Sequence, residues 1–301
     1  MKSISKKHFK NLYGKKIAVD TNIYMYKFIE NNELIENFYF MIALFQYYNI
    51  KPIFIFDGKI DKEKIETINR RKEQKFIAEE KYNKLLLEYN PNCEHMIELK
   101  KQFTRVPRNM FSEVKTLITL MGETYIDAPC EADELCSWLV ISNQVYGCLS
   151  EDTDMFAYGC PRILRYISFM SNQVVLYDLP HILNILHISQ KVLTQLCVLT
   201  GTDYNNGVND IYLLYREYEA YKKNTNSESF FDWVAKKYKC SPLQLTNYVN
   251  ICKMFTVVPF QPKGARGASR PDVIKLKIFL EKYNFIFMSS EISFQKKVMP
   301  N

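Results

Sequence analysis

The feature that most constrains the fold is a series of short apolar segments, each followed by acidic residues. The segments 16–20, 52–57 and 145–150 have the length of strands, and helix-length amphipathic stretches separate them. Buried strands that alternate with helices are typical of a mostly parallel sheet, whose ligands gather beyond the carboxyl ends of the strands. We therefore predict an α/β fold with a mostly parallel central sheet, flanked by helices, and a site along one edge.

Seven carboxylates fall where this fold would bring them together. Any one of them is explained equally well as a turn or helix cap. Together, so many anions in one cleft would repel each other unless cations neutralised them. Carboxylates favour hard ions such as Mg²⁺ or Mn²⁺, and two such ions would stabilise the attacking and leaving oxygens of a phosphodiester. The pattern predicts metal-assisted phosphodiester hydrolysis by Asp20, Asp57, Glu131, Asp133, Asp152, Asp154 and Asp203.

The composition sets wider bounds. A chain of 301 residues with 47% hydrophobic residues is globular and suits one large domain or two closely joined halves. A net charge of +7 fits an anionic partner without identifying it. The eight cysteines include no C-x-x-C pair, so we expect no structural zinc and a reducing intracellular compartment. No window approaches the length of a membrane span, and we expect no membrane association.

Two segments differ from the alternating pattern. Residues 59 to about 104 are highly charged with sparse apolar positions, which indicates a helical excursion from the sheet. After Asp203 the pattern becomes helical, and a basic glycine-rich loop at 262–270 precedes the last helix.

Four motifs give the chain a family resemblance. They are Phe56-Asp-Gly-Lys59, Ala128-Pro-Cys-Glu-Ala-Asp133, Leu149-Ser-Glu-Asp-Thr-Asp154 with Tyr158-Gly-Cys-Pro161, and Leu199-Thr-Gly-Thr-Asp-Tyr-Asn205. In this order they resemble the XPG/flap-endonuclease family of structure-specific 5′ nucleases over residues of about 15 to 205. The resemblance implies a PIN-like nuclease core at 1–205, a helical arch at about 58–124, and a helical C-terminal region at 206–301 with a degenerate helix–two-turn–helix.

The resemblance also implies roles for single residues. The seven acids match the family's metal-site positions, with Asp133 replacing a Glu. Lys64 and Arg71 match cations that reach the scissile phosphate, although a charged helix is commonly only solvated. Tyr26 matches an aromatic that stacks on a base, with core packing as the competing reading. Further expected DNA contacts are Lys59, Arg70, Arg105, Arg108, Lys263 and Arg266.

Three departures from the family pattern qualify these expectations. The chain begins Met1-Lys-Ser instead of Met-Gly-Ile. The segment from Gly207 lacks the later glycines through which the family's backbone approaches duplex phosphates and a potassium ion. The tail, Phe294 to Asn301, lacks the family's sliding-clamp motif, so recruitment through that motif is not expected.

The sequence therefore predicts a flap endonuclease and 5′→3′ exonuclease that acts on DNA in replication, repair or recombination. We expect a monomer with two Mg²⁺ or Mn²⁺ ions, bound to DNA with a single-stranded 5′ flap or 5′ end beside duplex. A nuclear site is expected, or a cytoplasmic replication site if the source is a large DNA virus, which the compact form allows. Alternatives are a nuclease that prefers another substrate (a bubble, nick, gap or RNA-containing 5′ end), a non-catalytic DNA-binding protein of the same fold, and a small PIN-type ribonuclease. The retained acids disfavour the second, and the arch-length insertion disfavours the third.

Overall fold

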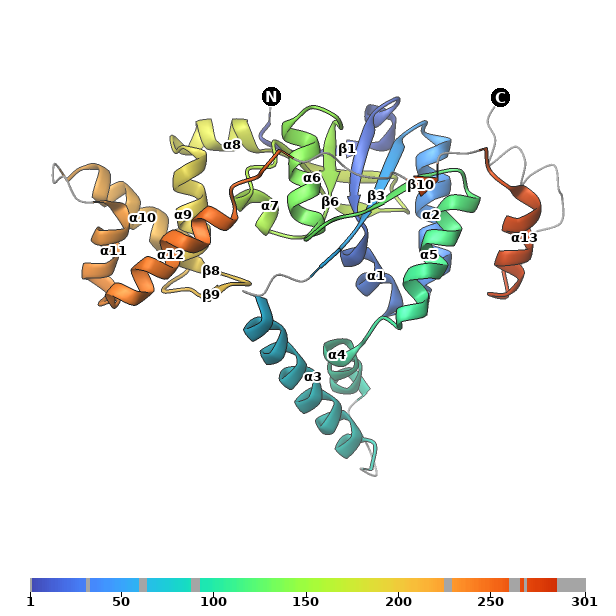
Figure 1. The fold of residues 1–301 in the computed structure, drawn as a ribbon, viewed down its shortest axis with the longest axis horizontal. Coiled ribbons are helices and arrows are strands. Elements are labelled where there is room, and N and C mark those ends of the chain that lie inside the picture. Colours follow the sequence, from blue (N-terminus) through green and yellow to red (C-terminus); the bar gives the residue numbers. More distant parts are fainter. Residues whose placement is uncertain are drawn as a thin grey trace.

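The computed structural model describes residues 2–30, 33–59, 64–87, 93–224, 229–259, 266–267 and 270–285. Its main sheet has the strand order β1-β7-β6-β5-β2-β3-β4-β10, and a two-stranded ribbon pairs β8 with β9 (Figure 1). The strands are β1 (Ile4–His8), β2 (Lys16–Asp20), β3 (Lys51–Phe56), β4 (Thr124–Asp127), β5 (Gly147–Leu149), β6 (Arg162–Ser168), β7 (Gln173–Asp178), β8 (Gly201–Thr202), β9 (Asn205–Asn206) and β10 (Arg266–Gly267).

Helices connect and cover these strands. A short 3₁₀ helix follows β1 at Phe9–Leu12. The α-helices are α1 (Thr21–Ile29), α2 (Leu34–Tyr47), α3 (Ile65–Leu85), α4 (Cys93–Phe103), α5 (Arg108–Leu120), α6 (Ala132–Ile141), α7 (Asp154–Ala157), α8 (Leu179–Leu186), α9 (Gln190–Thr200), α10 (Ile211–Lys222), α11 (Phe230–Tyr238), α12 (Pro242–Met254) and α13 (Val273–Glu281).

The centre of the main sheet is parallel and its margins are antiparallel. Strand β2 pairs in parallel with β3 and β5, and β4 and β6 extend the parallel set on either side. Strands β7, β1 and β10 are antiparallel additions at the two edges. The predicted α/β fold is confirmed, and the antiparallel margins are what the sequence pattern did not predict.

Alternate residues of the central strands bury two different cores. In β2, Ile17 and Val19 face the core formed with α1, α2, α5 and α13, while Ala18 faces the core formed with α6. In β3, Phe54 and Ile55 divide in the same way. Helices on both faces explain why the inner positions of these strands are all apolar instead of alternating with polar residues.

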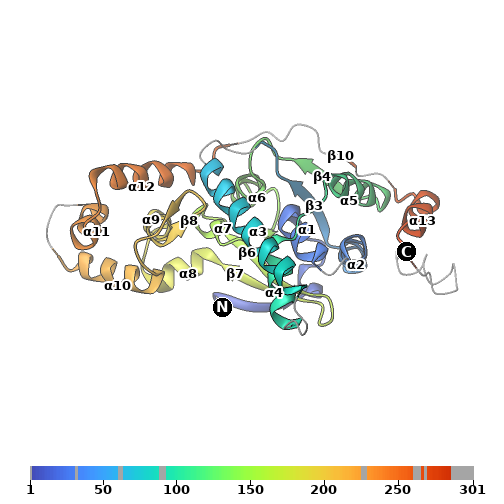
Figure 2. The same cartoon turned by 90° about the horizontal axis from the view of Figure 1, so that it is seen from below.

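Helices α3 and α4 project from the body as a pair (Figures 1 and 2). They pack on each other through buried Ala78 and Leu99, and the rings of Tyr82 and Phe103 meet edge to face with centroids 5.3 Å apart. The next helix, α5, returns to the sheet and buries Val114 in the core. The projecting part of the predicted 58–124 arch is thus α3 and α4, and α5 belongs to the body.

The helices after β7 occupy two places. Helices α8 to α12 share a third core beside the end of the sheet, which includes Leu199, Leu214 and Phe231. Helix α13 lies at the opposite end of the molecule, where the Asp272 amide donates to the Leu120 carbonyl at 2.9 Å and Leu276 is buried against α5 (Figure 1). Within the described segments, no single helix meets the length and apolarity needed to cross a membrane, and only the bent pair α8 and α9 passes that test jointly.

Candidate active site

The seven acids surround the carboxyl ends of the central parallel strands. Asp20 ends β2, Asp57 follows β3, and Asp152 lies two residues beyond Ser150, the residue after β5. The chain order reverses between β2 and β5, since β3 and β4 lie on one side of β2 and β5 and β6 on the other. Such a switch point opens a crevice beyond the strand ends, where α/β proteins bind ligands.

Asp20 is held by the neighbouring strand. Its side chain is 5% exposed, and its Oδ2 accepts a hydrogen bond from the Ser150 hydroxyl at 2.8 Å. The same hydroxyl oxygen accepts from the Asp152 amide at 3.0 Å, and the Asp154 amide donates to Asp152 Oδ1 at 2.8 Å. Ser150 therefore connects the acid of β2 to the two acids that follow β5.

Asp57 organises the start of α6. Its Oδ1 accepts from the Ala132 amide at 2.9 Å, and its Oδ2 accepts from Asn22 Nδ2 at 2.6 Å. A side chain at Gly58 is impossible in this arrangement, because a Cβ there would lie 1.9 Å from the Ala128 carbonyl oxygen. The Asp-Gly pair thus brings β3 against the first turn of α6, which carries Asp133.

Burial and mutual repulsion disturb the ionisation of these acids. Burial, followed by the charges of Asp57 and Asp152, raises the pKa of Asp20 to about 7, against an opposing hydrogen bond from Ser150. Burial and the charges of Asp152 and Asp203 raise the pKa of Asp154 to about 7. The pKa of Asp133 is raised by burial and by the charges of Asp20, Asp152 and Asp57. These interactions place all the predicted acids within one electrostatic neighbourhood.

The side chain of Lys64, the residue before α3, lies against Glu131. Its Nζ is 2.7 Å from Glu131 Oε1 and 3.6 Å from Asp203 Oδ2. Burial lowers the pKa of Lys64, but the Glu131 and Asp203 charges outweigh it and the net shift is upward. Tyr204 completes this group, since its hydroxyl donates to Glu131 Oε2 at 3.1 Å.

Side chains from the first turns of α3 contact the β8–β9 ribbon and its turn. Arg71 forms an ion pair with Asp203, and Thr67 donates a hydrogen bond to the Asp203 carbonyl. Arg70 Nη1 donates to Asn206 Oδ1 at 2.8 Å. Lys64, just before α3, and Arg71, seven residues later within it, therefore both point toward the acids.

The donor set suits a hard divalent cation. Every predicted ligand is a carboxylate, and Asp133 Oδ1 is an enclosed oxygen that has no hydrogen-bond partner in the described part of the chain. The side chains do not form a finished cage, because no group of three or more His, Cys, Asp or Glu residues within the described ranges is spaced to hold a metal ion. Instead, Lys64 forms an ion pair with Glu131, and Arg71 forms one with Asp203.

The predicted DNA contacts fall at different places. Tyr26 is 45% exposed and lies under Lys75, whereas Tyr24, two residues earlier, is fully buried, so core packing does not account for Tyr26. Arg105 Nη2 is 3.2 Å from Glu79 Oε2 on the arch. Lys59, Arg108 and Arg266 are exposed, and Lys263 lies outside the described residues.

Sequence reasoning missed three residues of the site. Asn22, Ser150 and Tyr204 hold Asp57, Asp20 and Glu131, respectively. Ser150 and Tyr204 lie within the family motifs 149–154 and 199–205, near or next to the acids. A polar residue in such a position could have been predicted to hold a neighbouring acid. Asn22 had no such signal, because only the packing of α1 beside β3 brings it to Asp57.

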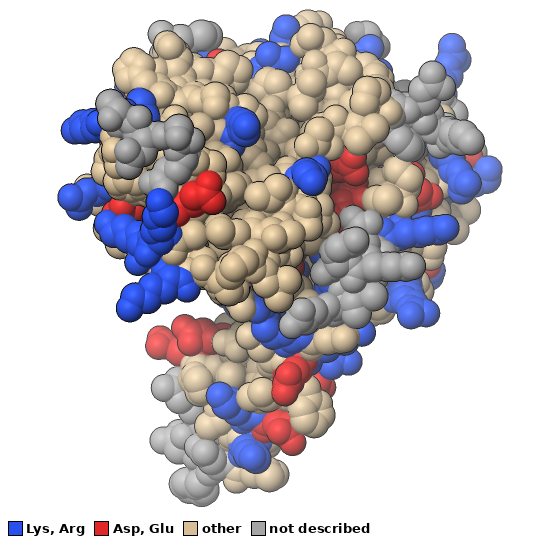
Figure 3. Space-filling view, turned by 60° about the vertical axis from the view of Figure 1, so that its left-hand side comes forward, with Lys and Arg blue, Asp and Glu red and all other residues tan. Residues whose placement is uncertain are grey.

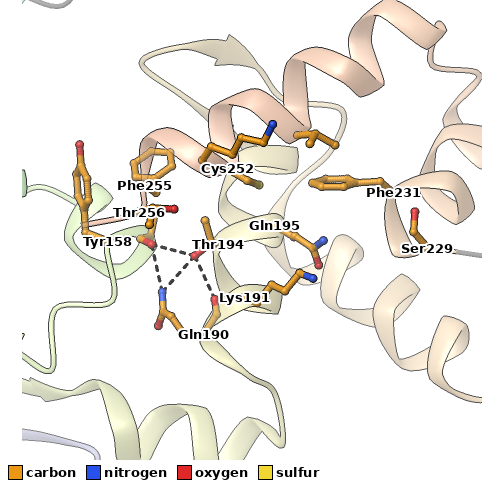
Figure 4. Close-up of a pocket in the computed structure, with 13 residues that line it drawn as sticks. Tyr158, Gln190, Lys191, Thr194, Gln195, Ser229, Phe231, Cys252, Phe255 and Thr256 are labelled. Atoms are coloured by element: carbon orange, nitrogen blue, oxygen red, sulfur yellow. Dashed lines mark hydrogen bonds between the residues drawn. The ribbon is translucent and has the colours of Figure 1, made fainter. Parts of the chain in front are cut away.

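A cavity of about 630 Å³ lies away from the acids, among α7, α9, α11 and α12 (Figure 4). Its walls include Tyr158, Gln190, Lys191, Phe231 and Phe255, and none of the described residues that line it is a carboxylate. It therefore lacks the chemistry of the acid cluster.

Basic side chains also mark the outside of the molecule, where Lys and Arg gather around the junction of the body with the projecting helices (Figure 3).

Comparisons with known proteins agree with this geometry. Family models of the XPG N-terminal domain and the XPG I-region match residues 1–78 and 122–203. Flap endonuclease 1 of Xenopus tropicalis is 30% identical over 223 residues, covering 67% of this chain and 57% of the relative. That of Drosophila mojavensis is 28% identical over 255 residues, covering 76% and 65%. The chain thus spans less than two thirds of the length of these relatives.

Solved structures show the same fold. The catalytic core of Rad2 in complex with DNA substrate has a TM-score of 0.65 at 23% identity, covering 98% of this chain and 94% of that one. Flap endonuclease-1 from Methanococcus jannaschii has a TM-score of 0.67 at 24% identity, with coverage of 98% and 94%. The sheet, the edge of acids and the projecting helices define a PIN-like α/β nuclease fold. Within that fold, the chain belongs to the XPG/flap-endonuclease family.

Proposed function

We propose that the protein is a metal-dependent, structure-specific 5′ nuclease that hydrolyses DNA at single-stranded 5′ ends or flaps beside duplex. The observation that carries the proposal is the crowding of seven carboxylates, three of them with raised pKa, beside two cations on a projecting helix. A fold needs no such collection of anions, since uncompensated buried charge is destabilising. The family's flap endonucleases support the same activity for this chain.

The acids divide into two groups that would hold two Mg²⁺ or Mn²⁺ ions. Asp20, Asp57 and Asp133 interact around the ends of β2 and β3, and Asp154 interacts with Glu131 and Asp203. Asp152 interacts with members of both groups and would lie between the two ions. Bound ions would supply Lewis acidity and lower the pKa of a water at the phosphodiester. A bound Mg²⁺ is named in a solved GEN1 complex with product DNA, which shares the fold. Ser150 and Asn22 orient Asp20 and Asp57 for this purpose.

Lys64 and Arg71 would change partners when DNA binds. In the structure their side chains form ion pairs with Glu131 and Asp203. Divalent ions on these carboxylates would release the two side chains toward the scissile phosphate, where cations stabilise developing negative charge. Exposed Tyr26 would stack on a base near the cut.

Strand selectivity would come from α3 and α4. They stand over the edge that carries the acids (Figure 2). Arg71, Lys75 and Lys81 line a hollow on them. A basic path of this kind suits a flexible single strand with a charged backbone. The protein would work as a monomer on DNA in replication, repair or recombination.

A substrate panel tests the proposal. Labelled 5′-flap, bubble, nicked, gapped, blunt and single-stranded DNAs, and a flap with RNA at its 5′ end, are incubated with the protein and Mg²⁺ or EDTA. We expect Mg²⁺-dependent cleavage, fastest on the 5′ flap and close to its base. Cleavage that is fastest on the bubble, gap or RNA end would replace the flap preference with that alternative. Binding to DNA without cleavage of any substrate would favour a non-catalytic DNA-binding member of the family.

A further inference from the structure

The tyrosine that follows Asp203 contacts both an acid and a cation of the site. The Tyr204 hydroxyl donates to Glu131 Oε2 at 3.1 Å, and Lys64 Nζ lies 4.9 Å from the centroid of the Tyr204 ring. Lys64 Nζ is also 2.7 Å from Glu131 Oε1. The three side chains therefore form a closed set of contacts, in which the tyrosine touches the other two with different parts of its side chain.

Tyr204 is itself held from the side of the C-terminal helices. Its ring packs edge to face on that of Phe255, with centroids 5.9 Å apart, and the rings of Phe255 and Tyr158 pack in the same way with centroids 4.9 Å apart. Figure 4 shows Tyr158 and Phe255 side by side at the end of the cavity. Helix α12, which precedes Phe255, thus reaches the acid site through rings packed edge to face.

We propose that Tyr204 is a positioning residue, whose hydroxyl fixes the Glu131 carboxylate and whose ring fixes the Lys64 ammonium. The inference rests on the proposed nuclease function of this site. Glu and Lys side chains have several rotatable bonds, and the freedom of Lys64 is costly to remove during a reaction. A rigid aromatic ring removes that freedom beforehand, because the ring attracts the cation and restricts its approach.

Two substitutions separate the two tasks. Tyr204→Phe removes only the hydroxyl and keeps the ring, while Tyr204→Leu removes both. We expect Tyr204→Phe to slow single-turnover cleavage of saturating 5′-flap DNA about 10-fold, the effect of one hydrogen bond to a charged group. Tyr204→Leu should slow it further, with DNA affinity measured in Ca²⁺ within about 3-fold of wild type in both variants, because neither group contacts DNA in this account.

A double-variant comparison isolates the action through Lys64. In a Lys64→Ala background the ring has no ammonium to hold, so Tyr204→Phe and Tyr204→Leu should reduce the rate equally. A purely structural tyrosine would keep the difference between Phe and Leu in both backgrounds. The matched control is Tyr215→Phe, which loses a hydroxyl bond of 3.1 Å to the Leu186 carbonyl in the same helical region and should cleave like wild type.

A second readout needs no substrate. In NMR spectra of the DNA-free protein, the Lys64 methylene next to Nζ should be shifted upfield by the Tyr204 ring, with assignment by comparison with Lys64→Ala. The shift should remain in Tyr204→Phe and disappear in Tyr204→Leu. A Lys64 signal that is identical in all three proteins overturns the inference. Wild-type rates in both Tyr204 variants also overturn it and leave the nuclease function standing, whereas an inactive wild type with the expected NMR shifts removes only the proposed function.

Discussion

At the scale of single residues, the site holds carboxylates whose charged form the folded state disfavours. Asp20 and Asp154 both have a pKa raised to about 7 by burial and by neighbouring acids. In the unfolded chain each would ionise near pH 3.8, the ordinary value. Between these values the folded state binds more protons than the unfolded state, so folded stability decreases as pH rises from about 4 through 7.

This sign gives a prediction for Asp154→Asn. The variant removes one ionisable group from the cluster, so in EDTA it should have a higher Tm than wild type, and the difference should be a few degrees larger at pH 8 than at pH 5. Added Mg²⁺ should stabilise wild type more than the variant at pH 8, since it binds only the folded acids. Thermal unfolding with and without EDTA provides the measurement. A Tm difference independent of pH would show that the pKa of Asp154 is not raised in the folded state.

Lys64 provides a second residue-scale prediction. Lys64→Ala should slow cleavage on the order of 100-fold, as removal of a cation that stabilises transition-state charge does. DNA affinity in Ca²⁺ should change by less than about 3-fold, because the side chain contributes mainly after binding. Lys72→Ala, an exposed change on the same helix, is the matched control and should leave the rate near wild type. Equal losses in rate and affinity for Lys64→Ala would make it an ordinary phosphate contact.

At the scale of elements, the sequence predicted the parts whose local pattern is complete. The limits of β2 agree at both ends, because an apolar run from Lys16 stops at Asp20. The helix-length amphipathic stretch predicted between β2 and β3 forms two separate helices, α1 and α2. The antiparallel margins depend on pairing between distant segments, such as Lys6 with Val175, which no local pattern contains.

The two arch helices have only a small core of their own. Ala78, Leu99 and the edge-to-face pair of Tyr82 and Phe103 supply it, while most of the surrounding residues of α3 and α4 are exposed. Local stability follows the amount of apolar contact, so the pair should open more readily than the sheet.

We therefore predict that Leu99→Ala loosens the arch and spares the body. Loss of this buried side chain costs about 2–5 kcal/mol in a well-packed core, and a two-helix projection has little stability in reserve. Limited proteolysis should cut the variant faster between residues 64 and 103, while the main thermal transition stays unchanged. Its preference for 5′-flap over blunt DNA should also shrink. A lowered main transition would show instead that the arch and body unfold together.

At the scale of the whole molecule, the last part of the chain is divided between the two ends of the sheet. Helices α8 to α12 stand beside the β7 end, and α13 packs on α5 at the other (Figure 1). The sequence indicated helices here without indicating their places, because the placement depends on tertiary contacts such as Leu276 in the α5 core. Phe255, in the core of α8 to α12, contacts Tyr204, whose hydroxyl donates to Glu131 of the acid site.

The most direct test of the central claim compares wild type with Asp154→Ala on one 5′-flap DNA. Single-turnover cleavage in Mg²⁺ is measured alongside binding of the same DNA in Ca²⁺, and an exposed acid on α3, as Glu73→Ala, serves as the control. We predict a rate lower by at least about 100-fold for Asp154→Ala, equivalent to about 2.7 kcal/mol of transition-state stabilisation, with DNA binding retained. Cleavage by Asp154→Ala at the wild-type rate would contradict the assignment of this cluster as the active site.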